Sequence, residues 1–275
     1  MAAGFFGSVS TLAKPALEEI NPILLTCMVY LISAAALTPS VLRQPLSFKR
    51  KDLMLIAGVA ISGAVIAPLM YFHGLQITTA SNTAVLSNTE TVFTVVMAIL
   101  FFKEKLSKIG YIGLVMVAIG AVIVTTNFEP SDFAFHLDVG NLLVIGSSLF
   151  WALDNNISKI ITKKVNVLKI AQLKSAIGGG LLLAVVFVTH VPILLKASEI
   201  PFVLLLGVVG FGMSLYFFLK AVKIIGIVKT IVIFATSSVF GLFFAVSFLH
   251  ETISMYQIIA IMVMISGVYL INKKG

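Results

Sequence analysis

The sequence predicts an all-α membrane protein, with ten transmembrane helices arranged as two inverted five-helix repeats. Three observations predict this fold class: an extreme apolar composition, ten apolar runs between polar breaks, and a similarity between the two halves of the chain. Of the 275 residues, 59% are hydrophobic and 11% are charged, and the mean hydropathy is +1.11. A soluble domain is about half apolar and about one quarter charged. The composition therefore leaves no room for a soluble domain.

Ten apolar runs follow one another along the chain, and each approaches the ~20 residues that a helix needs to cross a bilayer. In the first half, helices are expected at 2–17, 22–42, 53–75, 79–102 and 108–126. In the second half, they are expected at 139–162, 168–190, 200–220, 226–249 and 255–272. The breaks between them are short and polar, so we interpret the runs as spans joined by loops.

Basic residues gather in alternate breaks. If the N-terminus is cytoplasmic, the cytoplasmic breaks hold 16 of the 19 Lys and Arg residues, in "RQPLSFKRK", "KEKLSK", "KIITKKVNVLK", "KAVKIIGIVK" and "NKKG". The outer breaks hold Lys196 and the acidic residues Glu18, Glu19, Glu129, Asp132, Asp138, Glu199 and Glu251. Basic loops stay on the cytoplasmic side, so both termini are expected in the cytoplasm and the protein in the cytoplasmic membrane. The net charge of +8 thus reports topology, and nucleic acid is not an expected partner.

The two halves resemble each other at an offset of 147 residues. "VFTVVMAILFFKEKLS" ends at Ser107 and "VFGLFFAVSFLHETIS" ends at Ser254, while "KPALEEINP" and "KIITKKVNV" match at an offset of 145. Five helices is an odd number, so the second half must enter the membrane in the opposite direction. The charges agree, because "KEKLS" is basic and "HETIS" has lost its lysines. We expect repeat units at 1–127 and 138–275.

Inverted repeats are typical of secondary transporters, where two exchangeable conformations surround a site near the bilayer midplane. The alternatives are a passive channel, which would carry ohmic current, and a membrane scaffold without transport. An intramembrane enzyme is not favoured, because the sequence lacks the HExxH and GxSxG patterns. The four histidines show no metal-ligand spacing, so no metal, cofactor or catalytic residue is expected. The expected partners are a small-molecule substrate and the lipid bilayer, with a homodimer left open.

The chain resembles EamA-type transporters of the drug/metabolite transporter superfamily. The likeness is carried by residues 74–124 and 220–270, in which a polar helix, an apolar run, a Glu at the loop and a glycine-containing helix follow one another. The resemblance implies ten helices in two inverted repeats, and export or exchange of small metabolites. Such sequences often have Pro where this chain has Thr91 and Ser238, so any kink there must come from Ser and Thr hydroxyls that bond back to the backbone.

Glu90 stands in the polar stretch "TASNTAVLSNTETVFTVV" of the fourth run. On a continuous helix it shares a face with Thr83, Ser87, Thr91 and Thr94. A charged side chain at the centre of a spanning helix costs ~2.5–3.5 kcal/mol, so this face is expected to point into the bundle or a wet cavity. Glu90 is either a substrate or proton site, or a hydrogen-bonded residue that holds helices together. Its partner at the 147-residue offset is Ser237.

The sixth run contains Asp154, Asn155 and Asn156, and the seventh contains Lys174 at a similar depth. Three interpretations remain: an Asp154–Lys174 ion pair, an Asp154 that lines a cavity, or a Lys174 that reaches back to the interface. Lys14, in the first run, is expected to pair with Glu18 or to reach the outer interface.

The cavity is expected between the first, third, fourth, sixth, eighth and ninth helices. Among Trp151, Tyr30, Tyr71 and Tyr216, we prefer Trp151 and Tyr71 as its aromatic lining, because they lie near the polar positions in the sequence. The candidate substrate or proton residues are Glu90, Asp154, Asn155, Ser87, Thr83, Thr94, Trp151, Tyr71 and Ser237, with Asp154 and Lys174 as the candidate ion pair.

Overall fold

The computed structural model describes residues 1–42, 50–125 and 138–272, and every regular element in these ranges is helical. The all-helical prediction is therefore confirmed for the described part of the chain. Six helical runs in it are long and apolar enough to cross a membrane: Pro22–Val41, Lys51–Ile77, Ala80–Phe102, Val167–Val188, Ile200–Ile225 and Ile227–Leu249. Two shorter apolar helices cover Lys108–Ile123 and Met255–Ile271.

The first half of the chain contains α1 (Ala2–Gly7), α2 (Val9–Glu19), α3 (Pro22–Val41), α4 (Arg50–Ile61), the π-helix η1 (Ser62–Ile66), α5 (Ala67–Ile77), α6 (Ala80–Leu86), α7 (Thr89–Phe102) and α8 (Lys108–Thr125). The second half contains α9 (Val139–Ile161), α10 (Val167–Val188), α11 (Ile200–Leu205), the π-helix η2 (Leu206–Met213), α12 (Ser214–Ile225), α13 (Ile227–Phe234), α14 (Ser237–Leu249) and α15 (Met255–Asn272).

The helical runs follow the apolar runs of the sequence to within a few residues, with one substantial difference. The eighth run continues to Ile225 rather than residue 220, so the expected break at 220–229 shrinks to Gly226. Gly226 has φ +82°, a conformation that side chains with a Cβ rarely adopt, and this single residue turns the chain between α12 and α13. The lysines of that segment lie within α12 and α13, because a long Lys side chain is compatible with helix.

Two runs are divided where the sequence has Ser and Thr instead of Pro. Between α6 and α7, Thr89 donates its hydroxyl to the Leu86 carbonyl over 2.7 Å. Between α13 and α14, Thr236 donates to the Ile233 carbonyl over the same distance, and Ser238 donates to the Ala235 carbonyl over 2.9 Å. Hydroxyls bonded back to the helix backbone thus accompany both breaks, in the way expected for helices that bend without Pro.

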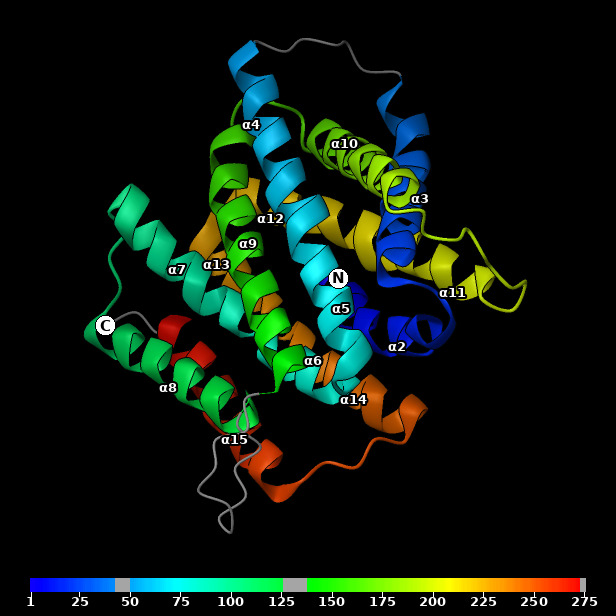
Figure 1. The fold of residues 1–275 in the computed structure, drawn as a ribbon. Helices are drawn as coiled ribbons and strands as arrows, with labels where there is room; N and C mark the ends of the chain where they lie inside the picture. Colours follow the sequence, from blue (N-terminus) through cyan, green and yellow to red (C-terminus); the bar gives the residue numbers. More distant parts are fainter. Residues whose placement is uncertain (43–49, 126–137, 273–275) are drawn as a thin grey trace.

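Long helices from the two halves lie against each other (Figure 1). α3 packs along α10, α8 packs along α15, and α5 and α7 both pack on α9. α6 packs against α14, while α7 contacts α13. The halves are therefore interleaved around a shared interior. Large apolar side chains such as Leu100, Phe101 and Phe248 point outward, as expected for surfaces that lipid solvates.

Candidate functional site

A cavity lies between the helices of the bundle, with about 450 Å³ of empty space when the solvent at its mouth is included. The cavity was expected between the first, third, fourth, sixth, eighth and ninth helical runs, and each of these contributes a lining residue. The second and seventh runs contribute as well, so that the lining comes from α1, α3, η1, α7, α9, α10, η2, α12 and α13. The residues that line it are Phe6, Tyr30, Gly63, Glu90, Trp151, Asp154, Asn155, Lys174, Gly210, Phe211, Ser214, Leu215, Phe218 and Phe234.

Asp154 on α9 and Lys174 on α10 form a salt bridge that faces this cavity. Both side chains are almost completely buried, with exposed fractions of 6% and 2%. Ser158, one turn along α9, donates its hydroxyl to the other Asp154 oxygen over 3.3 Å. Either charge alone would be costly to bury, and the pair satisfies both. Of the three interpretations of the sequence, the ion pair holds, and its Asp154 also lines the cavity.

Gly63 makes room for this ion pair. A Cβ on Gly63 would overlap the carboxylate of Asp154, so a larger residue could not stand there without displacing it. Gly63 lies in η1, and π-helical turns are frequent at functional sites. Its carbonyl oxygen accepts hydrogen bonds from the Tyr30 hydroxyl at 2.8 Å and from Trp151 Nε1 at 3.2 Å. This single π-helical turn thus makes room for the ion pair and holds two aromatic side chains of the cavity wall.

Glu90 is the second carboxylate at the cavity. Asn155 donates its side-chain amide to Glu90 Oε1 over 2.6 Å and to the Thr94 hydroxyl over 3.2 Å. Neighbouring Asn156 donates to the Thr94 and Ala152 carbonyls, and its own side-chain oxygen is buried without a hydrogen-bond partner. No described salt bridge involves Glu90. Within the described residues, Glu90 is thus oriented by an amide and forms no salt bridge, while Lys174, which is paired with Asp154, acts on it electrostatically without direct contact.

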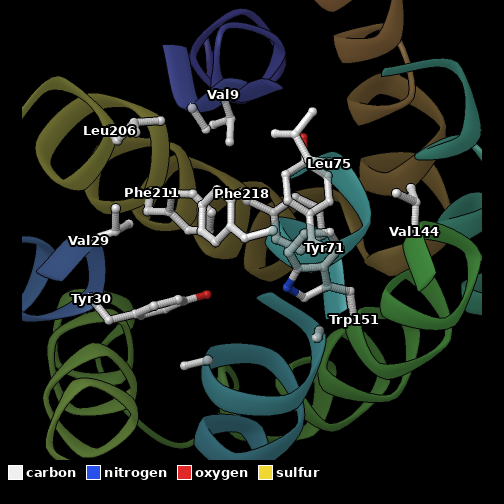
Figure 2. Close-up of a cluster of buried hydrophobic side chains, with 14 of the residues drawn as sticks. Val9, Val29, Tyr30, Tyr71, Leu75, Val144, Trp151, Leu206, Phe211 and Phe218 are labelled. Atoms are coloured by element: carbon white, nitrogen blue, oxygen red, sulfur yellow. The ribbon is translucent and has the colours of Figure 1, made fainter. Parts of the chain in front are cut away.

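Aromatic rings form the rest of the wall (Figure 2). Trp151 and Tyr71 lie side by side with ring centroids 5.2 Å apart, and Tyr30 reaches in from α3 to pack on Phe211 at 5.3 Å. Phe6 contacts Trp151, Phe211 and Phe234, while Phe218 meets Phe234 edge to face at 4.9 Å. The cavity thus combines an apolar, aromatic surface with one ion pair and one further carboxylate.

The predicted site residues divide into three groups. Glu90, Asp154, Asn155, Trp151 and Lys174 line the cavity. Thr94 and Tyr71 lie behind the lining, in contact with Asn155 and Trp151 respectively. Three residues take no part in it: Ser87 and Thr83 donate to carbonyls of their own helix, and Ser237 lies at the start of α14, beside α1.

Sequence reasoning missed much of the aromatic wall and preferred Tyr71 to Tyr30. The missed lining residues are Phe6, Phe211, Phe218 and Phe234, together with Ser214. For Phe211 and Ser214 a signal was available in the glycine-rich stretch "GVVGFGMS", which indicates close packing and mostly forms the π-helix η2 beside the cavity, whereas Phe6, Phe218 and Phe234 had none.

Two further hollows lie toward the ends of the helices. One, of about 590 Å³, shares Phe218 and Phe234 with the central cavity and reaches Met1 and Ile225. The other, of about 1040 Å³, is polar and includes Lys14, Gln76, Asn82 and Gln257. Lys14, which lines the polar hollow, forms no described salt bridge with Glu18 and instead binds backbone carbonyls. Its Nζ donates to the carbonyls of Leu75, Gln76 and Thr78 at 2.9, 3.1 and 2.5 Å, because α2 packs beside the end of α5.

Comparison with known proteins adds an independent line of evidence on the family of this chain. The pattern of the EamA-like transporter family matches residues 1–126 and 138–273. A protein of Methanothermobacter thermautotrophicus named "Uncharacterized transporter" is 31% identical, over 98% of this chain and 84% of that protein. A Haemophilus influenzae protein of the same name is 24% identical, over 80% of this chain and 74% of its own length. A solved structure, titled only as the crystal structure of a protein, shares the fold with a TM-score of 0.73 at 19% identity, over 98% of this chain and 94% of that one.

Proposed function

We propose a specific activity for this chain, which belongs to the EamA-like transporter family. Members of this family are membrane transporters of the drug/metabolite type and not enzymes. The protein is a secondary transporter that exports or exchanges small metabolites across the cytoplasmic membrane by alternating access. Amino acids and amines are the proposed substrates. The observation that carries this proposal is a buried carboxylate, Glu90, which faces a central cavity and forms no salt bridge among the described residues.

The cost of the buried charges favours a transport role. Ionisable residues inside a membrane protein are expensive, face cavities and mark substrate or ion pathways. The Asp154–Lys174 pair neutralises itself, whereas the Asn155 amide is the only hydrogen-bond partner described for the Glu90 carboxylate. A cationic amine or a proton would supply the missing positive charge. We therefore propose that Glu90 binds a substrate cation or a coupling proton. Both would bind to the same carboxylate oxygen atoms, so that only one of them can be bound at a time.

Matched features of the two halves support ten spans in two inverted repeats. η1 and η2 place a π-helix in the third and the eighth run. Lys103 and His250, which are 147 residues apart, end α7 and α14 with φ of +54° and +53°. The breaks after α6 and α13 also correspond, with a one-residue shift. The Glu90 amide donates to the Ser87 carbonyl and the Ser238 amide donates to the Ala235 carbonyl, so Ser238 rather than Ser237 takes the position of Glu90.

The proposed orientation places both termini in the cytoplasm. Lys159, Lys163, Lys164 and the Lys103–Lys108 segment then lie at the cytoplasmic ends of their helices, and Lys14 and Glu251 lie at the outer ends. Several charges that contribute to this assignment fall outside the described residues: Arg43, Lys49, Glu129, Asp132, Lys273 and Lys274. The hollow that shares Phe218 and Phe234 with the central cavity lies on the cytoplasmic side. The structure is accordingly assigned to an inward-facing state.

Counterflow in proteoliposomes tests the proposal. The purified protein is loaded with one unlabelled amine or amino acid and offered the labelled compound, from a panel that also contains sugars and organic anions. We expect saturable counterflow for at least one amine or amino acid, without ohmic current. An ohmic current without saturation would instead identify the alternative, a passive channel.

Glu90→Gln tests the role of the carboxylate. We expect at least about a tenfold loss of transport driven by a pH gradient, because the amide cannot take up a proton or neutralise a cation. Glu199→Gln is the matched control, since Glu199 accepts a backbone amide hydrogen bond in an outer loop and does not line the cavity. Normal pH-driven transport by the Glu90 variant would remove this residue from the mechanism.

A further inference from the structure

Two charged side chains hold the outer ends of α5 and α6. Lys14 donates to three carbonyl oxygens at the C-terminal end of α5. Glu251 accepts hydrogen bonds from the Ala80 and Ser81 amides at the start of α6, both at 2.8 Å. A cation at a helix C-terminus and an anion at a helix N-terminus each interact favourably with the helix dipole. Glu251 therefore ties the second half of the chain to the first at this end.

The surrounding contacts form a closed seam at the same end. Gln257 donates to the Asn82 side chain over 2.6 Å, again between the two halves. Gly241 on α14 lies so close to Ala84 on α6 that a Cβ on the glycine would stand 2.7 Å from the Ala84 Cβ. α6 and α14 are thus in direct contact, and the polar hollow at this end shares no lining residue with the central cavity, whereas the hollow at the opposite end shares Phe218 and Phe234 with it.

The equivalent residues at the opposite end make a different contact. Glu104 corresponds to Glu251 at the 147-residue offset, and Lys159 corresponds to Lys14 at 145. Glu104 and Lys159 bind each other in a salt bridge, with exposed fractions of 33% and 17%. Gly226 has no side chain with which to cap α13, and no described carboxylate bonds to the first amides of that helix. One pair thus caps two helix ends while its counterpart is paired with itself.

We propose that these four residues form two alternating latches. In the state described here, the outer latch is engaged, with Lys14 and Glu251 on the ends of α5 and α6. The inner latch is released, with Lys159 and Glu104 paired. In the opposite state the arrangement is exchanged: Glu104 accepts from the amides of Ile227 and Val228, Lys159 donates to the carbonyls at the end of α12, and Lys14 pairs with Glu251. This inference rests on the proposed alternating-access function.

The charges stay satisfied in both arrangements. A released latch forms an ion pair, so neither Lys nor Glu is left alone at the membrane boundary. An engaged latch replaces the ion pair with hydrogen bonds to helix ends, which otherwise carry unsatisfied amides and carbonyls. Two discrete and fully bonded arrangements are the requirement for a switch with two states rather than a continuous deformation. We assign the outer end as closed, because its hollow shares no lining residue with the central cavity, and the inner end as open, because its hollow shares Phe218 and Phe234 with that cavity.

Cysteine accessibility tests the latches in the full-length protein. In a Cys27→Ser background, Ala84→Cys lies in the outer seam and Ala221→Cys lines the cytoplasmic hollow. The rate of reaction of each cysteine with a membrane-impermeant maleimide reports whether its end is open. The latch variants are Glu251→Gln, Lys14→Met, Glu104→Gln and Lys159→Met, and Glu199→Gln serves as the matched control.

We expect Glu251→Gln and Lys14→Met to raise labelling at position 84 about tenfold and to lower it at position 221, because an engaged latch contributes more than a half-exposed ion pair. Glu104→Gln and Lys159→Met should shift both rates the other way, and Glu104→Gln combined with Glu251→Gln should return toward the wild-type ratio. Because both latches change in opposite directions, a loss of folding cannot imitate this pattern.

Two outcomes would overturn the proposal, and they are distinguishable. In the first outcome, a high labelling rate at one cysteine still accompanies a low rate at the other, but Glu251→Gln and Lys14→Met leave the ratio of the two rates as in the control. The latch proposal is then wrong, and the proposed transport function is unaffected. If both probes label together in every variant, the protein does not alternate and the proposed function itself fails, and the latches fail with it.

Discussion

The buried Asp154–Lys174 pair is the residue-scale feature with the clearest energetic consequence. Its members are held by α9, α10 and the Gly63 turn, and both side chains are almost completely buried. Removal of one partner from a buried pair is strongly destabilising, whereas replacement of both is often tolerated. The pair should therefore behave as one unit in stability measurements.

Lys174→Met should destabilise the protein by about 3–5 kcal/mol, because Asp154 is left unpaired in the bundle. Asp154→Asn combined with Lys174→Met should recover much of this loss. Thermal unfolding in detergent, followed by circular dichroism for the single and double variants, measures the coupling. If the two single effects simply add in the double variant, the pair contributes nothing as a unit.

At this scale the sequence predicts the charged residues of the cavity better than its aromatic residues. Glu90, Asp154 and Lys174 are conspicuous because an ionisable residue inside an apolar run must find a partner or a cavity. A ring has no such requirement, so Phe6, Phe218 and Phe234 are indistinguishable from core residues before the helices are placed. The preference for Tyr71 over Tyr30 rested on nearness in the sequence to polar positions. Tyr30 instead reaches the cavity from α3 through its hydrogen bond to the Gly63 carbonyl, a long-range contact that sequence distance does not reveal.

At the scale of elements, the divided helices α6–α7 and α13–α14 determine where the site lies. The break before Thr89 places Glu90 in the first turn of α7, beside Asn155 of α9, instead of on a continuous polar stripe with Thr83 and Ser87. The sequence predicted that stripe on the assumption of an unbroken helix. Without Pro, a break leaves only the weaker signal of clustered Ser, Thr and Asn.

Thr91→Pro should be well tolerated, at a cost of about 1 kcal/mol, because the break already exists and only the 3.0 Å bond from the Thr91 amide to the Asn88 carbonyl is lost. Val96→Pro, in the interior of α7, is the matched control and should cost about 3 kcal/mol or more. Unfolding temperatures of the two variants give the comparison. Equal destabilisation would show that α6 and α7 behave as one continuous helix.

Most helix ends could be predicted from the sequence, since apolar runs mark the segments expected in lipid and polar breaks mark the segments expected in water. The exception at Gly226 has a physical cause. Three lysines near it indicate a loop, but their long side chains can extend from helix ends into water while the backbone stays helical. Contacts such as Lys14 on the end of α5 were not accessible, because a carbonyl group at a helix end leaves no trace in the sequence.

For the whole molecule, the interleaved halves give the fold its function. Long helices of one half pack along helices of the other, so the central cavity belongs to neither half alone. The proposed inversion converts this arrangement into two equivalent states, because each half can adopt the conformation of its partner. The latches, the divided helices and the Glu90 site then act in a single cycle: substrate or proton binds centrally while one end is closed.

The inversion is the claim on which the rest depends, and side-specific labelling tests it most directly. In a Cys27→Ser background, Lys105→Cys and Thr252→Cys place one thiol at each of two corresponding loops. An impermeant maleimide is applied to right-side-out and to inside-out vesicles. If the repeats are inverted, the thiol at position 105 reacts only in inside-out vesicles and the thiol at position 252 only in right-side-out vesicles. Reaction of both thiols from the same side would contradict the inversion.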